Sequence, residues 1–328
     1  MKIYTHVLLS QKHFAALSGE VREILKKQTW WQQHGYEAVF FFLRLTLFAL
    51  GLLIFAQNGW PEKIIGMLIA SYAFYGVGIT GTHETRHSSF AKKERWNRLW
   101  AYFFSDFWAG QSNLWWHHRH VATHHVYTNV PNKEPKQFFY PWINKYVYFF
   151  VLPYLVTIWL FVHSVIFLWG KWKQLFIFLL LQTAGWALHI YLFSLILPLP
   201  YALLATLIMR SLFSPMFVHL AVFNHIGLDN PERKIPWLPH QSRTTRNLRP
   251  HWLINGMGGN AFVECHIEHH LFPTLSNRMI KKIRPNVKKY LEKEGYMYVE
   301  EGYISCLANC LKYYNEIFDA HPIQVVDL

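Results

Sequence analysis

The chain has 328 residues, of which 52% are apolar, 18% aromatic and only 16% charged. Typical soluble domains carry about 25% charged residues, so this composition argues against a soluble enzyme and for a protein embedded in lipid. The formal net charge of +13 does not by itself indicate a nucleic-acid partner, because the positive-inside bias of membrane proteins produces such an excess of Lys and Arg.

The N-terminal residues 1–37 are polar and of mixed charge, and they lack the pattern of a cleavable signal peptide. We expect them to form a cytosolic segment. The three cysteines, Cys265, Cys306 and Cys310, are too few for a disulfide framework. A reducing environment follows, in which Cys306 and Cys310 are predicted to be ordinary packed thiols.

Two apolar runs come next, at about 38–57 and 63–81, and the polar sequence from Gln57 to Pro61 separates them. Each run is close to the roughly 20 residues that a helix needs to cross a bilayer. The sequence therefore predicts a first membrane hairpin over 38–81. Residues 82–145 are rich in histidine and in basic and aromatic residues, and we expect a cytoplasmic, partly interfacial block there.

Three further apolar runs, at about 146–169, 174–198 and 201–224, raise a question of parity. If all three crossed the bilayer, the last histidines of the chain would lie opposite the earlier ones. Lysines flank the first run on both sides, which the positive-inside rule keeps on one face. We therefore predict that 146–169 is interfacial or re-entrant, and that 146–224 as a whole contains this helix and a second hairpin.

The predicted fold is a single all-α integral membrane domain spanning residues 1–328. Four transmembrane helices form two hairpins, accompanied by the interfacial or re-entrant helix. A cytosolic helical domain, to which the segment 225–328 contributes, caps the bundle and holds a metal site. The histidine-bearing face is expected to be cytoplasmic, in a bacterial inner membrane or the endoplasmic reticulum.

Three groups of histidines carry the chemistry, and each has the spacing of residues on one face of a helical turn. In chain order they are His83 and His87; His120, His124 and His125; and His266, His269 and His270. In the second group His120 and His124 are predicted to share a face, with His125 about 100° around the helix. Eight imidazoles exceed what one metal ion accepts, so two ions are implied.

All-nitrogen ligation suits iron, zinc, copper or nickel, and ligand softness alone does not choose among them. Zinc hydrolases usually add a carboxylate and a water-accessible cleft, whereas these histidines follow apolar spans and imply a lipid substrate. An unactivated hydrocarbon offers nothing to hydrolyse. A redox metal pair that reduces O₂ and abstracts hydrogen is the chemistry that fits.

The order HxxxH, HxxxHH and HxxHH resembles that of the membrane fatty acid desaturase family and its hydroxylase relatives. The resemblance extends over about residues 60–285 and includes the segments Trp115-Trp116, Tyr127-Thr128-Asn129, Arg243 to Asn247 and Glu268 to Pro273. The run from Tyr148 to Pro153 is also similar to the front-end branch of the acyl desaturases.

The resemblance implies a di-iron centre held by the eight histidines, with His225 as a ninth ligand and His219 as its rival. Asn224 could hold a water near one iron. It also implies O₂-dependent desaturation of a fatty acyl lipid or acyl thioester. Since no haem-binding cytochrome domain precedes the first span, electrons would come from a separate donor, a cytochrome b-type protein or a ferredoxin.

Two departures leave the position of the double bond open. The third group starts with His266, where the front-end branch commonly has glutamine. The segment Lys133-Glu134-Pro135-Lys136 stands where the family is usually acidic.

Other polar residues are candidates for supporting roles. Carboxylates can orient ligand imidazoles through the second ring nitrogen, and the candidates are Glu84, Asp106, Glu264 and Glu268. Three arginines, Arg243, Arg246 and Arg249, either grip a phosphate-bearing head group or acyl carrier or simply belong to a basic cytoplasmic loop. His117 and His118 fall outside the matched pattern.

Two other functions remain open at this point. A membrane hydroxylase or ketolase would use the same di-iron site on a lipid. A non-catalytic metal-binding or transport protein would instead place its ionisable ligands inside the spans, whereas here they lie beyond the span ends.

Overall fold

The computed structural model describes residues 2–131, 133–134 and 143–319, and 76% of it is helical. The α-helices are α1 (Lys2–Lys26), α2 (Tyr36–Phe55), α3 (Trp60–Arg86), α4 (Glu94–Ala101), α5 (Asn113–Trp116), α6 (His125–Tyr127), α7 (Lys145–Phe150), α8 (Val156–Leu168), α9 (Trp172–Ser194), α10 (Leu199–Ser211), α11 (Ser214–Phe223), α12 (Trp237–Thr244), α13 (Trp252–Phe262), α14 (His266–Leu271), α15 (Asn277–Lys293), α16 (Tyr303–Lys312) and α17 (Tyr314–Asp319). Three π-helical stretches, η1 (Trp31–Gly35), η2 (Tyr102–Ala109) and η3 (His117–His124), and one 3₁₀ turn, η4 (Leu152–Leu155), interrupt them. The strands β1 (Asn247–Leu248) and β2 (Glu300–Glu301) pair in parallel.

Four helical segments in the described part of the chain are long and apolar enough to cross a membrane, as the sequence predicts. They are Trp31–Phe55, Trp60–Arg86, Trp172–Ser194 and Leu199–Phe223. The apolar helix Leu152–Leu168 is shorter and belongs to the segment that we predicted not to cross. That it is interfacial or re-entrant stays a prediction.

The second span extends further than its apolar run, because α3 continues to Arg86 and includes His83 in its last turns. Its side chains from Ala73 to Thr85 are all buried. Polar residues near this end therefore face other helices, so the helix does not have to end where the hydrophobic pattern does. Where the membrane-spanning part of this helix ends stays a prediction.

Close contact between α2 and α3 depends on two glycines. A Cβ on Gly51 would lie 2.6 Å from the backbone nitrogen of Ala70, and one on Gly66 would lie 2.6 Å from the carbonyl oxygen of Gly51. Small residues allow membrane helices to approach backbone to backbone, where packing replaces the missing hydrophobic drive. The glycines at these two positions therefore allow α2 and α3 to pack at the close distance seen in the first hairpin.

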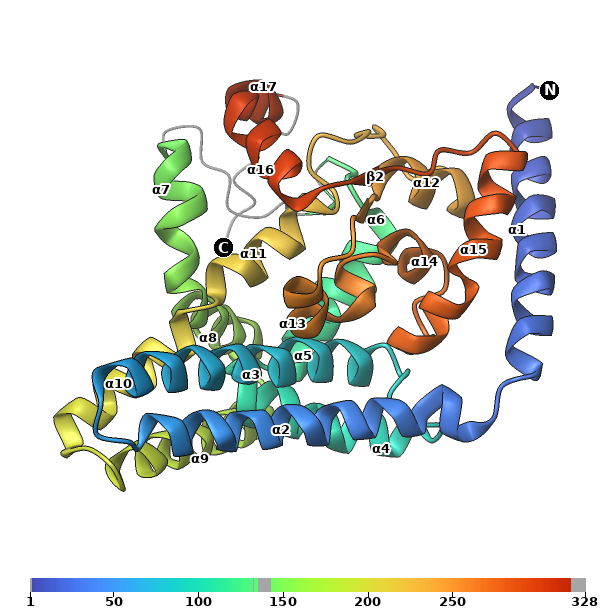
Figure 1. Cartoon of the computed structure of the whole chain (residues 1–328). Coiled ribbons are helices and arrows are strands. Elements are labelled where there is room, and N and C mark those ends of the chain that lie inside the picture. Colours follow the sequence, from blue (N-terminus) through green and yellow to red (C-terminus); the bar gives the residue numbers. More distant parts are fainter. Residues whose placement is uncertain (1, 132, 135–142, 320–328) are drawn as a thin grey trace.

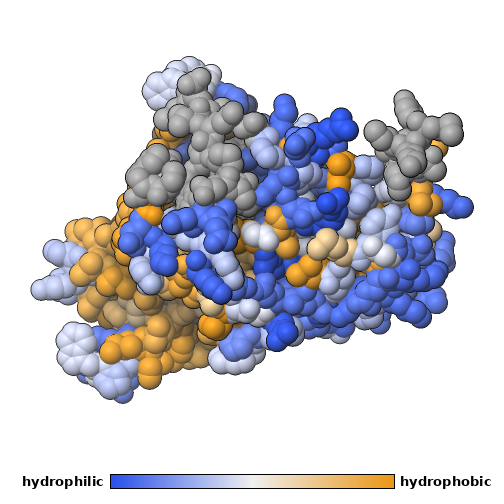
Figure 2. Space-filling model, turned by 90° about the horizontal axis from the view of Figure 1, so that it is seen from above, coloured by the Kyte–Doolittle hydropathy of each residue, from blue (hydrophilic) through white to orange (hydrophobic). Residues whose placement is uncertain are grey.

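Helices α1 and α12 to α15 form a cap toward the end of the bundle that lies away from the turns of the two hairpins (Figure 1). In this cap α1 packs along α15, with Leu17 and Val21 against Ile283 and Val287. Figure 2 shows the division of the surface: hydrophobic residues gather over the spans, and hydrophilic residues cover the cap. The three cysteines are buried and free, which confirms that no disulfide links the described residues.

Candidate metal centre

The cap brings the predicted histidines together in two groups, each with four ring nitrogens within 4.8 Å of one another. The first group is His83, His87, His120 and His269, and the second is His124, His225, His266 and His270. Each group draws on at least three separate segments of the chain. The three sequence motifs therefore meet at one end of the spans, as the parity argument requires.

His125 adds a ninth imidazole next to the first group. Its Nε2 atom lies 3.2 Å from Nε2 of His120 and 3.1 Å from Nε2 of His269. Its ring also stacks on His270, with centroids 4.2 Å apart. His125 thus stands between the two groups.

His120 and His124 of the second motif lie on η3, and His125 begins α6 directly after it. The amide of His125 donates to the carbonyl of His120, five residues back. This turn is wider than an α-helical turn, and such widening is frequent at functional sites. His120 and His124 share a face as predicted, with stacked rings 5.1 Å apart, but they enter different groups.

The ring nitrogens have the separations expected of ligands around an ion. Nε2 of His83 lies 3.0 Å from Nε2 of His269, and Nε2 of His225 lies 2.8 Å from Nε2 of His266. Nitrogens about 2.0–2.1 Å from a divalent ion lie roughly 3–4 Å from each other. In addition, Nε2 of His87 and of His270 are buried without a hydrogen-bond partner. The donor set therefore fits two metal ions.

Burial favours the neutral form of several of these imidazoles, which is the form that binds a metal. It lowers the pKa of His266 to about 3. It also lowers the pKa values of His87, His120, His125, His269 and His270, and the neighbouring histidines lower them further. The largest cause in every case is the loss of solvation of the charged ring; for His266 the hydrogen bond to the Ala261 carbonyl opposes the shift.

All four imidazoles of the second group are oriented through Nδ1. The carboxylate of Glu134 bonds Nδ1 of His124, and the carbonyl oxygens of Thr244 and Ala261 lie 2.9 and 2.6 Å from Nδ1 of His225 and His266. Nδ1 of His270 lies 2.9 Å from Oε1 of Gln241. Such partners fix the tautomer and turn Nε2 toward a metal.

The four carboxylates suggested by the sequence have other partners. Glu84 accepts hydrogen bonds from Asn277, and Asp106 from Asn113. Glu268 accepts from Tyr298 and Asn247, and Glu264 pairs with Lys281 and Arg284. Each is thus bound to a neighbouring element of the fold, and that any of them orients an imidazole stays a prediction.

The sequence reasoning missed Glu134 and Gln241. Glu134 was visible only as an acidic residue ten positions after His124, in a segment noted for departing from the family. Its neighbours Pro135 and Lys136 lie outside the described residues. Gln241 carried no signal, because its partner is 29 residues away.

His225, and not His219, joins the second group of histidines. His225 is 6% exposed and belongs to the second group, whereas its rival His219 contacts Tyr303 and the carbonyl of Phe149. Asn224 donates to the carbonyls of Leu220 and Phe262, and its Oδ1 is buried without a partner. That oxygen is available for the water suggested by the sequence.

The three arginines proposed for a head group differ in accessibility. Arg246 is 6% exposed, and its guanidinium binds Glu301 and the carbonyl of Ile226, so it offers no surface to a lipid. A head-group contact of Arg246 therefore has no support in the structure. Arg243 pairs with Asp229 near the surface, and Arg249 is exposed.

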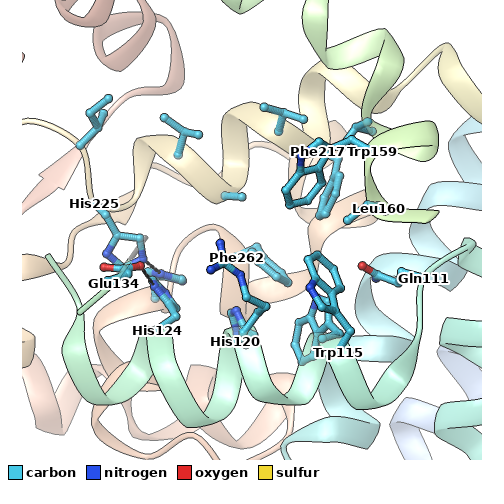
Figure 3. Close-up of a pocket in the computed structure, with 18 residues that line it drawn as sticks. Gln111, Trp115, His120, His124, Glu134, Trp159, Leu160, Phe217, His225 and Phe262 are labelled. Carbon is cyan, nitrogen blue, oxygen red and sulfur yellow. Dashed lines mark hydrogen bonds and ion pairs between the residues drawn. The ribbon is translucent and has the colours of Figure 1, made fainter. Parts of the chain in front are cut away.

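A cavity of about 200 Å³ borders the histidines and lies between η3, α8 and α11 (Figure 3). His124, His225 and Glu134 stand at one end of it, and Gln111, Trp115 and Leu160 at the other. Its walls are mainly apolar, with Trp159, Phe217 and Phe262 among them. A smaller cavity of about 30 Å³ adjoins it, shares Gln111, Trp116 and Leu160, and reaches α3.

Comparison with known proteins gives a consistent result. The sequence profile described as "Fatty acid desaturase" matches residues 58–302. The chain is 28% identical over 324 residues to "Fatty acid desaturase 6" of Mus musculus, which covers 95% of this chain and 93% of that protein. It is 29% identical to the Homo sapiens protein of the same name, over 92% of this chain and 87% of that one. With "Fatty acid desaturase 3" of Bos taurus it shares 27% identity, over 77% of this chain and 61% of that protein.

Proposed function

The chain belongs to the fatty acid desaturase family, and from this membership we propose that it uses two iron ions and O₂ to introduce a double bond into a fatty acyl chain. It is an oxidoreductase and an integral membrane protein. The acyl group would be carried by a lipid or by an acyl thioester. Electrons would come from a separate cytochrome b-type protein or ferredoxin.

The observation that carries the proposal is the placement of two four-nitrogen groups beside an apolar cavity. His83, His87, His120 and His269, with His125, would hold one iron; His124, His225, His266 and His270 would hold the other. When bound, the iron pair would supply the reduction of O₂ and the removal of hydrogen from a methylene group.

The protein's own part in the reaction is to bind and position the acyl chain. Trp115, Trp159 and Phe262 line the cavity with apolar surface, which favours an alkyl chain and excludes water. Glu134, Gln241 and two backbone carbonyls hold ring nitrogens of the second group in place. No side chain is needed as an acid or base at the C–H bond.

The proposal also includes the orientation of the protein in the membrane. With the histidine end in the cytoplasm, the turns that join α2 to α3 and α9 to α10 would face the opposite side. A reporter fused after residue 172 should then report a cytoplasmic position. A periplasmic or lumenal signal there would contradict this topology.

The function is tested by expressing the full chain in a host that lacks the expected lipids and locating double bonds in its fatty acids by mass spectrometry. We expect a new unsaturated product. His124→Ala and His269→Ala should abolish both the product and the bound iron, while His251→Ala, which changes an exposed histidine, should keep both. A hydroxylated product in place of the alkene would favour the hydroxylase alternative.

A further inference from the structure

A buried amide stands at the end of the large cavity away from His124. Gln111 is 4% exposed, and its Oε1 atom is buried without a hydrogen-bond partner. Gln111 lines both the large cavity and the small one beyond it. Figure 3 shows its side chain pointing toward the interior of the cavity, near Trp115 and Leu160.

Two hydroxyl side chains at this end are already bound within the protein. Tyr75 and Thr157 line the small cavity, and both hydroxyls donate to the carbonyl oxygen of Arg210, at 2.5 and 3.0 Å. Among the described residues around the small cavity, Gln111 is thus the polar side chain that keeps an unpartnered acceptor.

The backbone holds Gln111 firmly in this position. Its amide nitrogen lies 3.2 Å from the carbonyl oxygen of Ser105, whose hydroxyl donates back to the Gln111 carbonyl at 2.9 Å. The next residue, Ser112, donates its amide to the hydroxyl of Ser164 on α8 at 2.8 Å. Gly110 before it has a φ of 101°, a conformation that glycine adopts without strain. The amide is therefore presented from a fixed turn.

An unpartnered amide oxygen costs free energy in an apolar cavity, and a plain alkyl chain cannot satisfy it. A carboxylate has no donor to offer this oxygen. An ammonium group would need a carboxylate partner, and no carboxylate lines the small cavity among the described residues. A hydroxyl supplies one donor on an otherwise aliphatic chain, which matches one acceptor among aromatic walls.

We propose that Gln111 forms a subsite for a hydroxyl group carried by the acyl chain, at a position on the far side of His120 from His124. The inference rests on the proposed function, because it takes the cavity as the acyl site. It narrows the substrate class to hydroxylated acyl chains. A site built to bind a hydroxyl rejects the analogue that lacks it.

The test compares pairs of acyl substrates that differ only by a hydroxyl placed at successive carbons of the distal half of the chain. For the wild-type holoenzyme we expect kcat/KM to be about 10-fold or more higher with the hydroxyl at one position than without it. In Gln111→Leu and Gln111→Met this ratio should fall to about 1. Iron content and thermal unfolding of each variant report whether it folds.

Binding provides a measurement that does not depend on turnover. A non-reacting hydroxylated fatty alcohol and its plain counterpart are titrated against the quenching of tryptophan fluorescence, since Trp115 and Trp116 line the cavity. The hydroxylated probe should bind about 10-fold more tightly to the wild type, and the two probes equally to the variants.

Two results distinguish failure of the Gln111 subsite from failure of the proposed function. Equal affinity of the wild type for both probes at every hydroxyl position would overturn the Gln111 subsite. The Oε1 atom of Gln111 would then bind an enclosed water instead. Preferential binding of the hydroxylated probe without conversion of any substrate would retain the subsite and count against the proposed function.

Discussion

The Nδ1 atom of His124 hydrogen bonds to the carboxylate of Glu134, ten residues further along the chain. The same carboxylate accepts the backbone amide of Asn129 at 2.6 Å, so it also closes the turn that follows the second histidine motif. A carboxylate bound to one ring nitrogen raises the basicity of the other and fixes its direction. Glu134 therefore links the backbone turn at Asn129 to the position of His124 in the second histidine group.

Glu134→Gln should weaken the metal site without removing a ligand. The neutral amide lacks the charge that favours an Nδ1–H donor, so we expect the affinity for one of the two ions to fall by about 10–100-fold. Competition with a chelator, followed by metal analysis, measures this. Glu94→Gln is the matched control, because Glu94 pairs with Arg98 on an exposed helix. Equal retention of metal in both variants would refute the role of Glu134.

Removal of metal should proceed in two stages. In the described part of the chain, every Nδ1 atom of the second group has an acceptor, whereas Nδ1 of His269 in the first group is buried without one. Because such partners strengthen binding, a chelator should first extract the ion held with His269. The protein should then retain about one ion per chain, and His266→Ala should abolish this remaining fraction. A single-stage loss of both ions, or retention unaffected by His266→Ala, would contradict this order.

Hydropathy located the four spans because membrane insertion depends on local composition. It did not show that α3 continues beyond the apolar run to Arg86, since burial of His83 among other helices is a tertiary property. The spacing of the motifs identified the histidines but not their grouping. His120 groups with His269 and not with His124, although the rings of His120 and His124 stack, and the spacing of the motif does not show this.

The partners of Nδ1 were beyond sequence reasoning for a related reason. Thr244 and Ala261 contribute backbone carbonyls, which every residue possesses, so no side-chain pattern marks them. Gln241 reaches His270 only through the packing of α12 on α14. The sequence offered carboxylates close to the motifs as candidates, and one of them, Glu268, accepts hydrogen bonds from Tyr298 and Asn247.

Gly185 should be required for the packing of α9 on η2. A Cβ there would overlap the carbonyl oxygen of Phe107, while a Cβ on Gly19 in α1 would meet nothing within 4 Å. We expect Gly185→Ala to destabilise the protein by about 1–3 kcal/mol through overpacking. Gly19→Ala, the same chemical change, should be neutral or stabilising, since alanine favours a helix over glycine. Thermal unfolding in detergent measures both, and equal midpoints would contradict the predicted overlap.

Acid should destabilise the metal-free protein over a defined range of pH. Burial lowers the pKa of His266 to about 3, against 6.5 for the exposed ring. Above pH 6.5 neither state is protonated at this residue, so its contribution is constant. Below pH 6.5 this ring is protonated in the unfolded state but not in the folded state. The free energy of unfolding therefore falls by about 1.4 kcal/mol per pH unit for one such group until the pH approaches 3.

The pKa values of the other buried histidines of the site are lowered as well, so the total slope should exceed that of one group. The unfolding midpoint of chelator-treated protein should therefore drop steadily between pH 6.5 and 5. In His266→Asn the slope should be shallower, because one of the titrating rings is gone. Bound metal competes with the same protons, so the loaded protein should hold its midpoint to lower pH. A midpoint independent of pH in the metal-free protein would show that these rings are not buried as neutral groups.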